Sequence, residues 1–241
     1  MTVSHAQPVT MQPATMPPTT VLLTAGDSAL IDRLHRKLPA VEARVIGPDL
    51  PSRQFRGRLY CFVDWLLPEL SGLEMCRRLR ESPATRHGHI TMVLDSADPE
   101  DCRRALRAGA DDYLVGPLDA AKLAERLAVF NGSTLAPTSR DRLTLGDLSL
   151  DLAAQKMRYR GTAVPLSPNE LGLLAHFMAY PDRVFGRPAL IAALGKDVAG
   201  IDERTVDVWI GRLRRALVAH GVPDPLRTVR TMGYVLDSPA N

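Results

Sequence analysis

The sequence predicts an α/β chain in which a doubly wound, five-stranded parallel sheet is followed by a smaller α+β domain. Three observations support this. Short apolar segments alternate with helical segments five times between residues 20 and 130. Residues 131–141 then break both periodicities and are predicted to be a linker. In residues 142–238, short strands lead into amphipathic helices and a basic hairpin, which is a different order of elements.

The composition fits two soluble domains. Of 241 residues, 45% are hydrophobic and 24% charged, which allows two modest cores. Residues 1–19 hold four prolines among Thr, Gln and Met, and are predicted to be a disordered tail. No apolar run approaches the roughly 20 residues that cross a bilayer, and the N-terminus lacks the features of an export signal. We therefore expect a cytoplasmic protein without membrane contact.

The cysteines indicate a reducing compartment. Cys61, Cys76 and Cys102 are odd in number and far apart, without the paired spacing of zinc ligands. No metal or cofactor site is predicted. No nucleophile with a neighbouring base and no glycine-rich phosphate loop is evident either, so an independent enzyme is not expected.

In the first domain, each expected strand is followed by a helix, except that residues 43–46 lead directly to the third strand. The strands are expected at residues 21–23, 43–46, 59–63, 90–94 and 112–115, and the helices at residues 29–38, 73–81, 99–108 and 120–129. Parallel sheets of this kind place their functional site at the carboxyl ends of the strands.

The second domain begins with expected strands around residues 143–152 and 156–159. Ser167, Pro168 and Glu170 form a capping box with proline at the first helical position, which predicts a helix to about residue 179. A shorter helix is expected over residues 188–194.

Residues 204–217 form the most informative segment. Apolar side chains recur there at helical spacing, at Val206, Ile210, Leu213 and Leu217. The other face is cationic, which suits the major groove of DNA, where guanidinium groups bind guanine edges or phosphates. Residues 227–236 then alternate as a basic hairpin around a turn at residues 231–233. Helix and hairpin together predict a winged helix; the alternative is an ordinary surface helix with a solvated charged face.

The net charge supports nucleic-acid binding only weakly. Residues 20–141 hold 17 basic and 17 acidic side chains, whereas residues 142–241 hold 13 and 10. The prediction therefore depends on where the arginines lie.

With these motifs in view, the chain resembles the OmpR/PhoB family of response regulators from residue 20 onward. In the second domain the matching segments are residues 146–148, 166–170, 204–208, 212–214 and 227–230, with Gly233 and Tyr234. The resemblance implies a flavodoxin-like receiver followed by a winged-helix domain that binds tandem half-sites on double-stranded DNA as a homodimer. It also implies that the loop of residues 196–203 can contact RNA polymerase.

The DNA contacts follow from this resemblance. Base edges are expected to be contacted by Arg204, Thr205, Val208 and Arg212. The DNA backbone is expected to be contacted by Arg214, Arg215, Thr228 and Arg230, or in the case of Arg230 the minor groove. Trp209 stands where the family usually has His, and either contacts DNA or joins the core.

In the first domain the strand and loop pattern resembles that of the family, whereas the residues that assist phosphorylation differ. Residues 62–72 resemble the phosphoacceptor strand and loop, which makes Asp64 the acceptor position. The acidic pair, hydroxyl and lysine that assist phosphorylation in the family are replaced by Ala25, Gly26, Leu94 and Gly116. Mg²⁺ and a lysine normally neutralise the charge that develops on the phosphoryl group, and loss of one such stabiliser costs about 10² to 10³ in rate.

We therefore expect a degenerate receiver, with Asp64 vestigial and the regulator independent of phosphorylation. Leu94 is expected to hold Tyr113, the switch aromatic, in one rotamer. Two alternatives stay open. Asp64 can be phosphorylated with Asp27 as a makeshift metal ligand, although Asp27 or Ser28 is better explained as a helix cap. The receiver can also act mainly as a protein-interaction module.

Dimerisation is expected through the family's receiver face. On that face Asp112 and Arg126 retain an ion pair, while other positions have altered charges: the set is Cys102, Arg107, Asp112, Lys122 and Arg126. The alternative is a monomer that pairs only on DNA.

Overall fold

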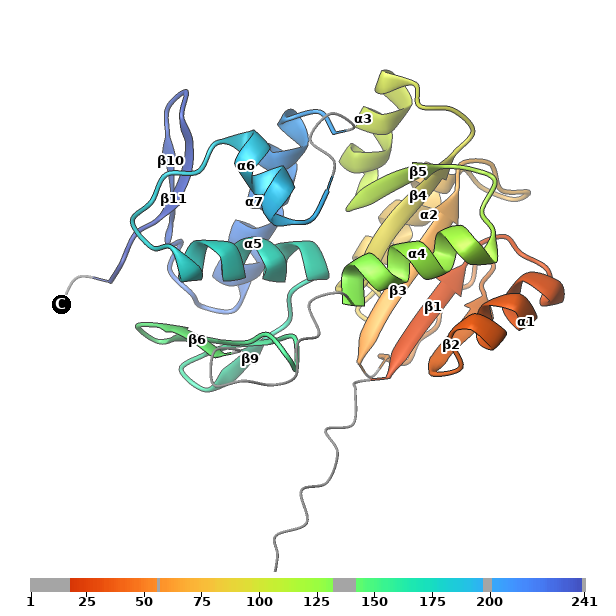
Figure 1. Ribbon diagram of the computed structural model, residues 1–241, viewed down its shortest axis with the longest axis horizontal. Helices are drawn as coiled ribbons and strands as arrows, with labels where there is room; N and C mark the ends of the chain where they lie inside the picture. Colours follow the sequence, from red (N-terminus) through yellow and green to blue (C-terminus); the bar gives the residue numbers. More distant parts are fainter. Residues whose placement is uncertain (1–17, 56, 132–141, 197–200, 240–241) are drawn as a thin grey trace, which may run out of the picture.

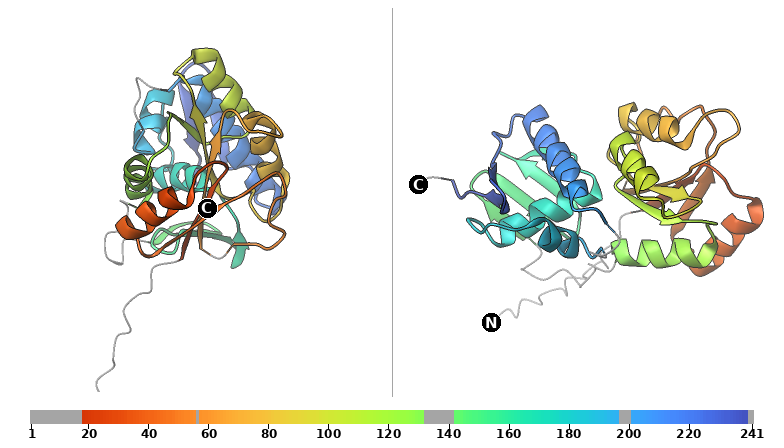
Figure 2. Two further views of the ribbon diagram at one scale, coloured as in Figure 1. Left: turned by 90° about the vertical axis from the view of Figure 1, so that its right-hand side faces the viewer. Right: turned by 90° about the horizontal axis from the view of Figure 1, so that it is seen from above.

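The computed structural model describes residues 18–55, 57–131, 142–196 and 201–239, which form two domains lying side by side (Figures 1 and 2). Residues 1–17 of the predicted tail and 132–141 of the predicted linker lie outside the described residues. Thr19, which the tail prediction included, is already the first residue of a strand. Among the described residues, no helix is long and apolar enough to cross a membrane.

The first domain is a five-stranded parallel sheet, as predicted, and its strand order is β2-β1-β3-β4-β5. Its strands are β1 (Thr19–Leu23), β2 (Val41–Val45), β3 (Arg58–Asp64), β4 (His89–Leu94) and β5 (Asp112–Val115). On one face α1 (Ser28–Lys37) packs with α4 (Ala120–Asn131), and on the other α2 (Gly72–Glu81) packs with α3 (Pro99–Ala108). The sheet therefore has a separate apolar core on each side (Figure 1).

Strand alternation explains the two cores. Successive side chains of a strand point to opposite faces, so Tyr60 and Phe62 join the core under α1 and α4, while Cys61 and Val63 join the core under α2 and α3. A strand with a continuous apolar run, such as residues 59–63 of β3, must be buried on both faces.

The second domain contains the antiparallel sheet β6-β7-β8-β9, three helices and a two-stranded hairpin. The elements are β6 (Arg142–Leu145), β7 (Leu148–Asp151), β8 (Lys156–Tyr159), β9 (Thr162–Val164), α5 (Pro168–Ala179), α6 (Arg187–Ala193), α7 (Arg204–Ala219), β10 (Leu226–Val229) and β11 (Gly233–Leu236). The short strands predicted around residues 143–152 are β6 and β7, which form a hairpin because Gly146 adopts a left-handed backbone at the turn between them. β9 was not predicted.

The core of this domain is built on α7. The four apolar residues predicted to form its stripe are at most 1% exposed, and the predicted capping box of Ser167 and Glu170 is present at the start of α5. The basic hairpin β10–β11 requires glycine at one position. Gly233 has φ +140°, and a Cβ there would lie 1.9 Å from the carbonyl oxygen of Phe185. The hairpin is thus held against the residues before α6.

Candidate functional site

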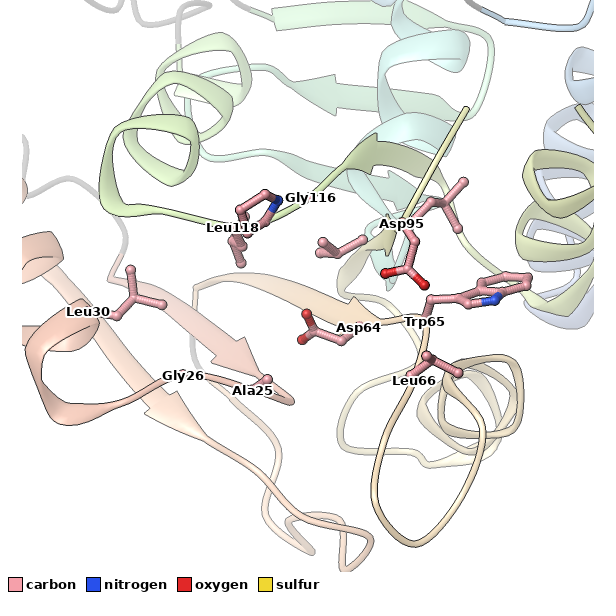
Figure 3. A pocket seen from close by; sticks show the side chains of 12 residues that line it. Ala25, Gly26, Leu30, Asp64, Trp65, Leu66, Asp95, Gly116 and Leu118 are labelled. Atoms are coloured by element: carbon pink, nitrogen blue, oxygen red, sulfur yellow. The ribbon is translucent and has the colours of Figure 1, made fainter. Parts of the chain in front are cut away.

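A cavity of about 430 Å³ opens at the carboxyl ends of β1, β3, β4 and β5 (Figure 3). Asp64, the last residue of β3, contributes one carboxylate to its wall, and Asp95 after β4 contributes another. The remaining lining residues carry no charged side chain: they are Ala25, Gly26, Leu30, Trp65, Leu66, Val93, Leu94, Gly116, Pro117 and Leu118. All four positions that replace the family's assisting groups therefore line this cavity.

Asp64 is held by Thr24, a residue that the sequence analysis did not single out. The Thr24 hydroxyl donates to Oδ2 of Asp64 over 3.0 Å, and the backbone N–H of Asp64 donates to that hydroxyl over 2.8 Å. Burial raises the pKa of the Asp64 carboxyl, and Asp95 also raises it, whereas the Thr24 hydroxyl lowers it. The carboxylate thus has a hydrogen-bond donor but no cationic neighbour in the cavity lining.

The residues around Asp64 do not supply the shell that Mg²⁺ needs. Ala25 and Gly26 offer no side-chain oxygen, and no group of three or more His, Cys, Asp or Glu side chains among the described residues can hold a metal ion. Asp27 accepts a hydrogen bond from the backbone N–H of Leu30 over 2.7 Å, so it caps α1. The cap interpretation of Asp27 is therefore the one that the structure shows.

Leu94 and Tyr113 share one apolar core. Leu94 is buried, and Tyr113 is half-buried against the same cluster. Burial raises the pKa of Tyr113, as does its hydrogen bond with the thiol of Cys102. Cys102 itself is buried, so its predicted place on an exposed dimer face is wrong: the apolar face of α3 turns it toward the sheet.

In the second domain, the exposed residues of the predicted DNA set are Arg204, Arg215, Thr228 and Arg230. Val208 is half-buried. Trp209 and Thr205 are 1% and 4% exposed, which excludes both from base contact in this structure. Helical spacing gives the reason, because positions 205 and 209 flank the apolar stripe at Val206 and lie toward the core. For Trp209 the core alternative is the correct one.

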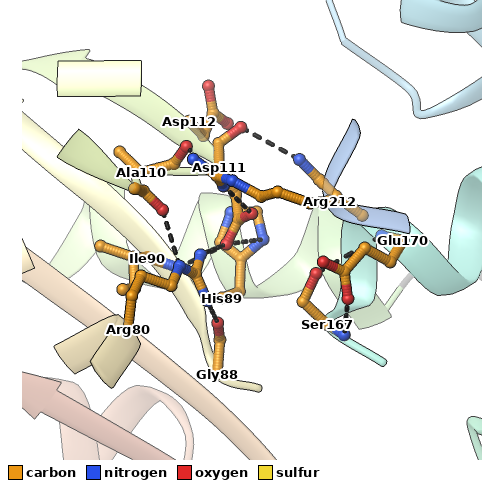
Figure 4. A network of polar contacts seen from close by, with 12 residues as sticks. Arg80, Gly88, His89, Ile90, Ala110, Asp111, Asp112, Ser167, Glu170 and Arg212 are labelled. Carbon is orange, nitrogen blue, oxygen red and sulfur yellow. Dashed lines mark hydrogen bonds and ion pairs between the residues drawn. The ribbon is translucent and has the colours of Figure 1, made fainter. Parts of the chain in front are cut away.

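Arg212 contacts the receiver domain rather than solvent (Figure 4). Its Nη1 donates to the carbonyl oxygen of Ala110 and pairs with Oδ1 of Asp111, both at 3.1 Å, and its Nη2 donates to the carbonyl oxygen of Leu106 over 2.8 Å. Its side chain is 12% exposed. In this arrangement Arg212 is unavailable to a base edge, contrary to the prediction.

Asp111 is the centre of this interdomain contact. Its carboxylate pairs with Arg80 of α2 and accepts a hydrogen bond from the backbone N–H of Ile90 over 2.9 Å (Figure 4). Burial acts to raise its pKa, but Arg80, His89 and Arg212 outweigh burial and lower it to about 2. Asn169 of α5 donates to the backbone oxygen of Asp111 over 3.0 Å. These contacts join α3 and β5 of the receiver to α5 and α7.

Asp112 belongs to the same contact. Its Oδ2 lies 2.9 Å from Nζ of Lys196 in the second domain and 3.3 Å from Nη1 of Arg126 in α4. The ion pair predicted to cross a dimer interface is therefore formed within one chain. On the same face, Lys122 donates to the carbonyl oxygens of Val115 and Pro117, and Arg107 is exposed.

Two further residues position α7 and the hairpin. Oδ1 of Asp207 accepts hydrogen bonds from Nε of Arg187 over 2.8 Å and from the Tyr234 hydroxyl over 2.6 Å. Arg214, predicted to meet phosphate, instead pairs with Asp224 and donates to the carbonyl oxygen of Leu226 and to the Thr228 hydroxyl. The sequence analysis missed Asp207 because its partners come from separate elements.

Comparison with known proteins agrees with this architecture. Residues 58–128 match the model of the response regulator receiver domain, and residues 161–236 match that of the C-terminal domain of transcriptional regulatory proteins. The chain is 40% identical over 177 residues to the phosphate regulon transcriptional regulatory protein PhoB of Rhizobium meliloti (strain 1021), which covers 73% of this chain and 78% of that protein. The chain belongs to the OmpR/PhoB family of response regulators.

Other relatives give the same result. PhoB of Escherichia coli (strain K12) is 31% identical over 172 residues, covering 71% of this chain and 75% of that protein. The solved structure of a RitR mutant has a TM-score of 0.54 and 18% identity, and covers 91% of this chain and 99% of that chain, which shows likeness of fold. This member of the OmpR/PhoB family is thus a DNA-binding response regulator with a receiver domain and a C-terminal winged helix.

Proposed function

We propose that this response regulator controls transcription without phosphorylation of Asp64, by sequence-specific binding to tandem half-sites as a homodimer. The observation that carries the proposal is the cavity around Asp64, whose lining contains two carboxylates and no cationic side chain. A dianionic phosphoryl group added there would meet the Asp95 carboxylate and no neutralising charge. Among the described residues, no metal-binding cluster offsets this repulsion.

The proposed DNA surface is smaller than the sequence predicted. Arg204 and Val208 at the start of α7 would face base edges, while Arg215, Thr228 and Arg230 would meet the DNA backbone. Arg212 joins this surface only after its contacts with Ala110 and Asp111 break. The structure therefore corresponds to a closed arrangement in which the DNA surface is incomplete.

We propose that the chain dimerises and contacts RNA polymerase only after its two domains separate. The predicted dimer face includes Asp112, which pairs with Lys196 in the closed arrangement. Release of Lys196 would free Asp112 for the proposed dimer face. The proposed polymerase contact at residues 196–203 includes residues 197–200, which lie outside the described residues. We propose that the open regulator acts on chromosomal DNA in the cytoplasm.

Phosphodonor labelling tests the proposal. The full chain is incubated with acetyl phosphate and Mg²⁺ and separated on a phosphate-affinity gel. We expect no Mg²⁺-dependent shifted band, and Asp64→Asn should keep operator affinity within about twofold of the original chain. A band that requires both Mg²⁺ and Asp64 would overturn the proposal.

A gain-of-function variant provides the matched control. Ala25→Asp with Gly116→Lys returns one carboxylate and one ammonium group to the cavity. A Cβ at Gly116 would lie 3.1 Å from Cγ1 of Val93, so the lysine requires only a small shift. Labelling in this variant, together with its absence in the original chain, would show that the missing charges account for the loss.

A further inference from the structure

A second cavity, of about 630 Å³, lies between the two domains. It begins at the amino ends of β3 and β4, so it is at the opposite end of β3 from Asp64. The receiver contributes Leu59, Gly88 and the loop before β4, and the second domain contributes β8, the segment between β9 and α5, and His220 at the end of α7. Its volume falls within the range of about 300–1,000 Å³ typical of small-molecule sites.

The charged residues that line this cavity are all basic. Arg86 comes from the receiver, and Lys156 and Arg158 come from β8. His87 and His220 add one imidazole from each domain, and no Asp or Glu occurs among the described residues that line the cavity. Bringing the domains together thus sets like charges opposite one another, which opposes closure unless an anion lies between them.

The titration of His87 supports this description. Burial lowers the pKa of His87 to about 4, and the Arg86 guanidinium acts in the same direction. His87 is therefore neutral at pH 7 and can hydrogen-bond to a ligand without adding charge. His87 and His220 line the same cavity, so basic groups of both domains meet there.

Most of the remaining lining is apolar, with Gln54 and Gln155 as polar exceptions. The accessible apolar residues include Phe55 and Pro83 on the receiver side, and Pro165 and Leu166 on the other. Such a lining suits the ring or chain of an organic molecule, whereas the arginines suit a phosphate group, to which guanidinium binds in a bidentate geometry.

We propose that this interdomain cavity binds a small organic phosphate. Arg86, Lys156 and Arg158 hold its phosphate group, and its apolar body packs on Phe55 and Pro165. Because the cavity has walls from both domains, the ligand binds the closed arrangement more tightly than any open one, and so favours closure. Its effect on DNA binding rests on the proposed function above; the binding itself does not.

Calorimetric titration of the full chain tests the site. The probes are adenosine 5′-monophosphate, phenyl phosphate, inorganic phosphate and adenosine, all at one ionic strength. We expect at least one of the two organic phosphates to bind with 1:1 stoichiometry and more tightly than both inorganic phosphate and adenosine. Failure of both organic phosphates to saturate the protein below about 10 mM, which corresponds to negligible affinity, overturns the proposal. So does equal binding of inorganic phosphate.

Variants on both sides of the cavity sharpen the test. Arg86→Gln and Arg158→Gln should each weaken binding about tenfold, since each removes a charged hydrogen-bond donor. Arg160→Gln is the matched control: Arg160 is close in sequence and exposed, but pairs with Asp147 and does not line the cavity. Unchanged binding in either cavity variant, or an equal loss in the control, contradicts the assignment.

A second readout separates this inference from the proposed function. The bound ligand should lower the radius of gyration in X-ray scattering and weaken operator binding. Ligand binding that leaves both quantities unchanged contradicts coupling to closure. If the chain bound no operator at all, the proposed function would fail, while the titration and the scattering would still decide the ligand site.

Discussion

Asp111 accepts hydrogen bonds from both domains, so a receiver carboxylate holds Arg212, which the sequence predicted to contact DNA. A buried charge is tolerated only when it is paired, and Asp111 is paired with Arg80 inside the receiver and with Arg212 outside it. Arg80 keeps the carboxylate ionised even after Arg212 leaves. The receiver can therefore release Arg212 without burying an unpaired charge.

His89 next to this carboxylate makes stability depend on pH. His89 is fully buried, and burial lowers its pKa to about 4. Between this value and the unfolded pKa of about 6.5, the unfolded chain binds a proton that the folded chain does not. His89 therefore does not destabilise the folded chain above about pH 6.5, and it lowers the free energy of unfolding progressively as the pH falls toward 4.

We expect the free energy of unfolding to fall between pH 7 and pH 5, by on the order of 2 kcal/mol from His89. Urea unfolding of the full chain at both pH values measures the change. His89→Gln should reduce the pH dependence, whereas His35→Gln, on the exposed side of α1, should leave it as it was. If His89→Gln and His35→Gln had the same pH dependence of unfolding, His89 would not be its source.

Single residues also show what the sequence could and could not predict. The apolar stripe of α7 and the cap at Asp27 depend on local spacing, and the structure has both. Arg212 was assigned to DNA from helical spacing and the family resemblance, and Asp112 to a dimer face from the resemblance alone. Their partners lie far away in the chain, 101 residues for Arg212 (Asp111) and 84 residues for Asp112 (Lys196), and no local pattern indicates such contacts.

At the scale of elements, the carboxylate of Asp207 links α7 to two neighbouring elements. Asp207 joins α7 to α6 through Arg187 and to the hairpin strand β11 through Tyr234. The ring of Tyr234 also lies beneath the guanidinium groups of Arg187 and Arg214, at 5.5 and 5.8 Å. Helix α7 and the hairpin, which carry the proposed DNA contacts, are thus held in one geometry by Asp207 and Tyr234.

Asp207→Asn should lower the free energy of unfolding by about 1 kcal/mol, because Asp207 and Arg187 are partly exposed and solvent screens their attraction. Operator binding should weaken as well, since the hairpin loses its fixed position. The matched control is Asp237→Asn, which breaks the exposed pair with Arg227 in the same hairpin. An equal loss of stability and affinity in both variants would show that Asp207 has no special role.

The elements themselves were largely predictable, for a physical reason. Strands buried on both faces, such as β3 and β4, are predominantly apolar, and residues 59–63 of β3 form a continuous apolar run between Arg58 and Asp64. By contrast, β9 has three residues, two of them exposed, and owes its strand conformation to pairing with β8. Short edge strands of this kind are determined by their partner, so composition does not reveal them.

At the scale of the whole molecule, closure would compete with the proposed dimerisation for the carboxylate of Asp112. Asp112 pairs with Lys196 in the closed chain, while the predicted dimer would use the same face of the receiver. Lys196 also makes a cation–π contact, with Nζ 5.5 Å from the centre of the Trp209 ring. A protein that binds DNA only when open loses apparent affinity in proportion to the closed fraction.

Breaking the Asp112–Lys196 pair should therefore strengthen operator binding. Lys196→Gln leaves the dimer face intact and is expected to raise affinity by about five- to a hundredfold, the range of typical coupling energies, and to increase the radius of gyration. Asp112→Asn should open the chain equally but gain less affinity, because it also alters the dimer face. Glu125→Gln, which removes an exposed charge from α4, is the control and should change neither quantity. If Lys196→Gln opened the chain in scattering but left operator affinity unchanged, the closed arrangement would not restrain DNA binding.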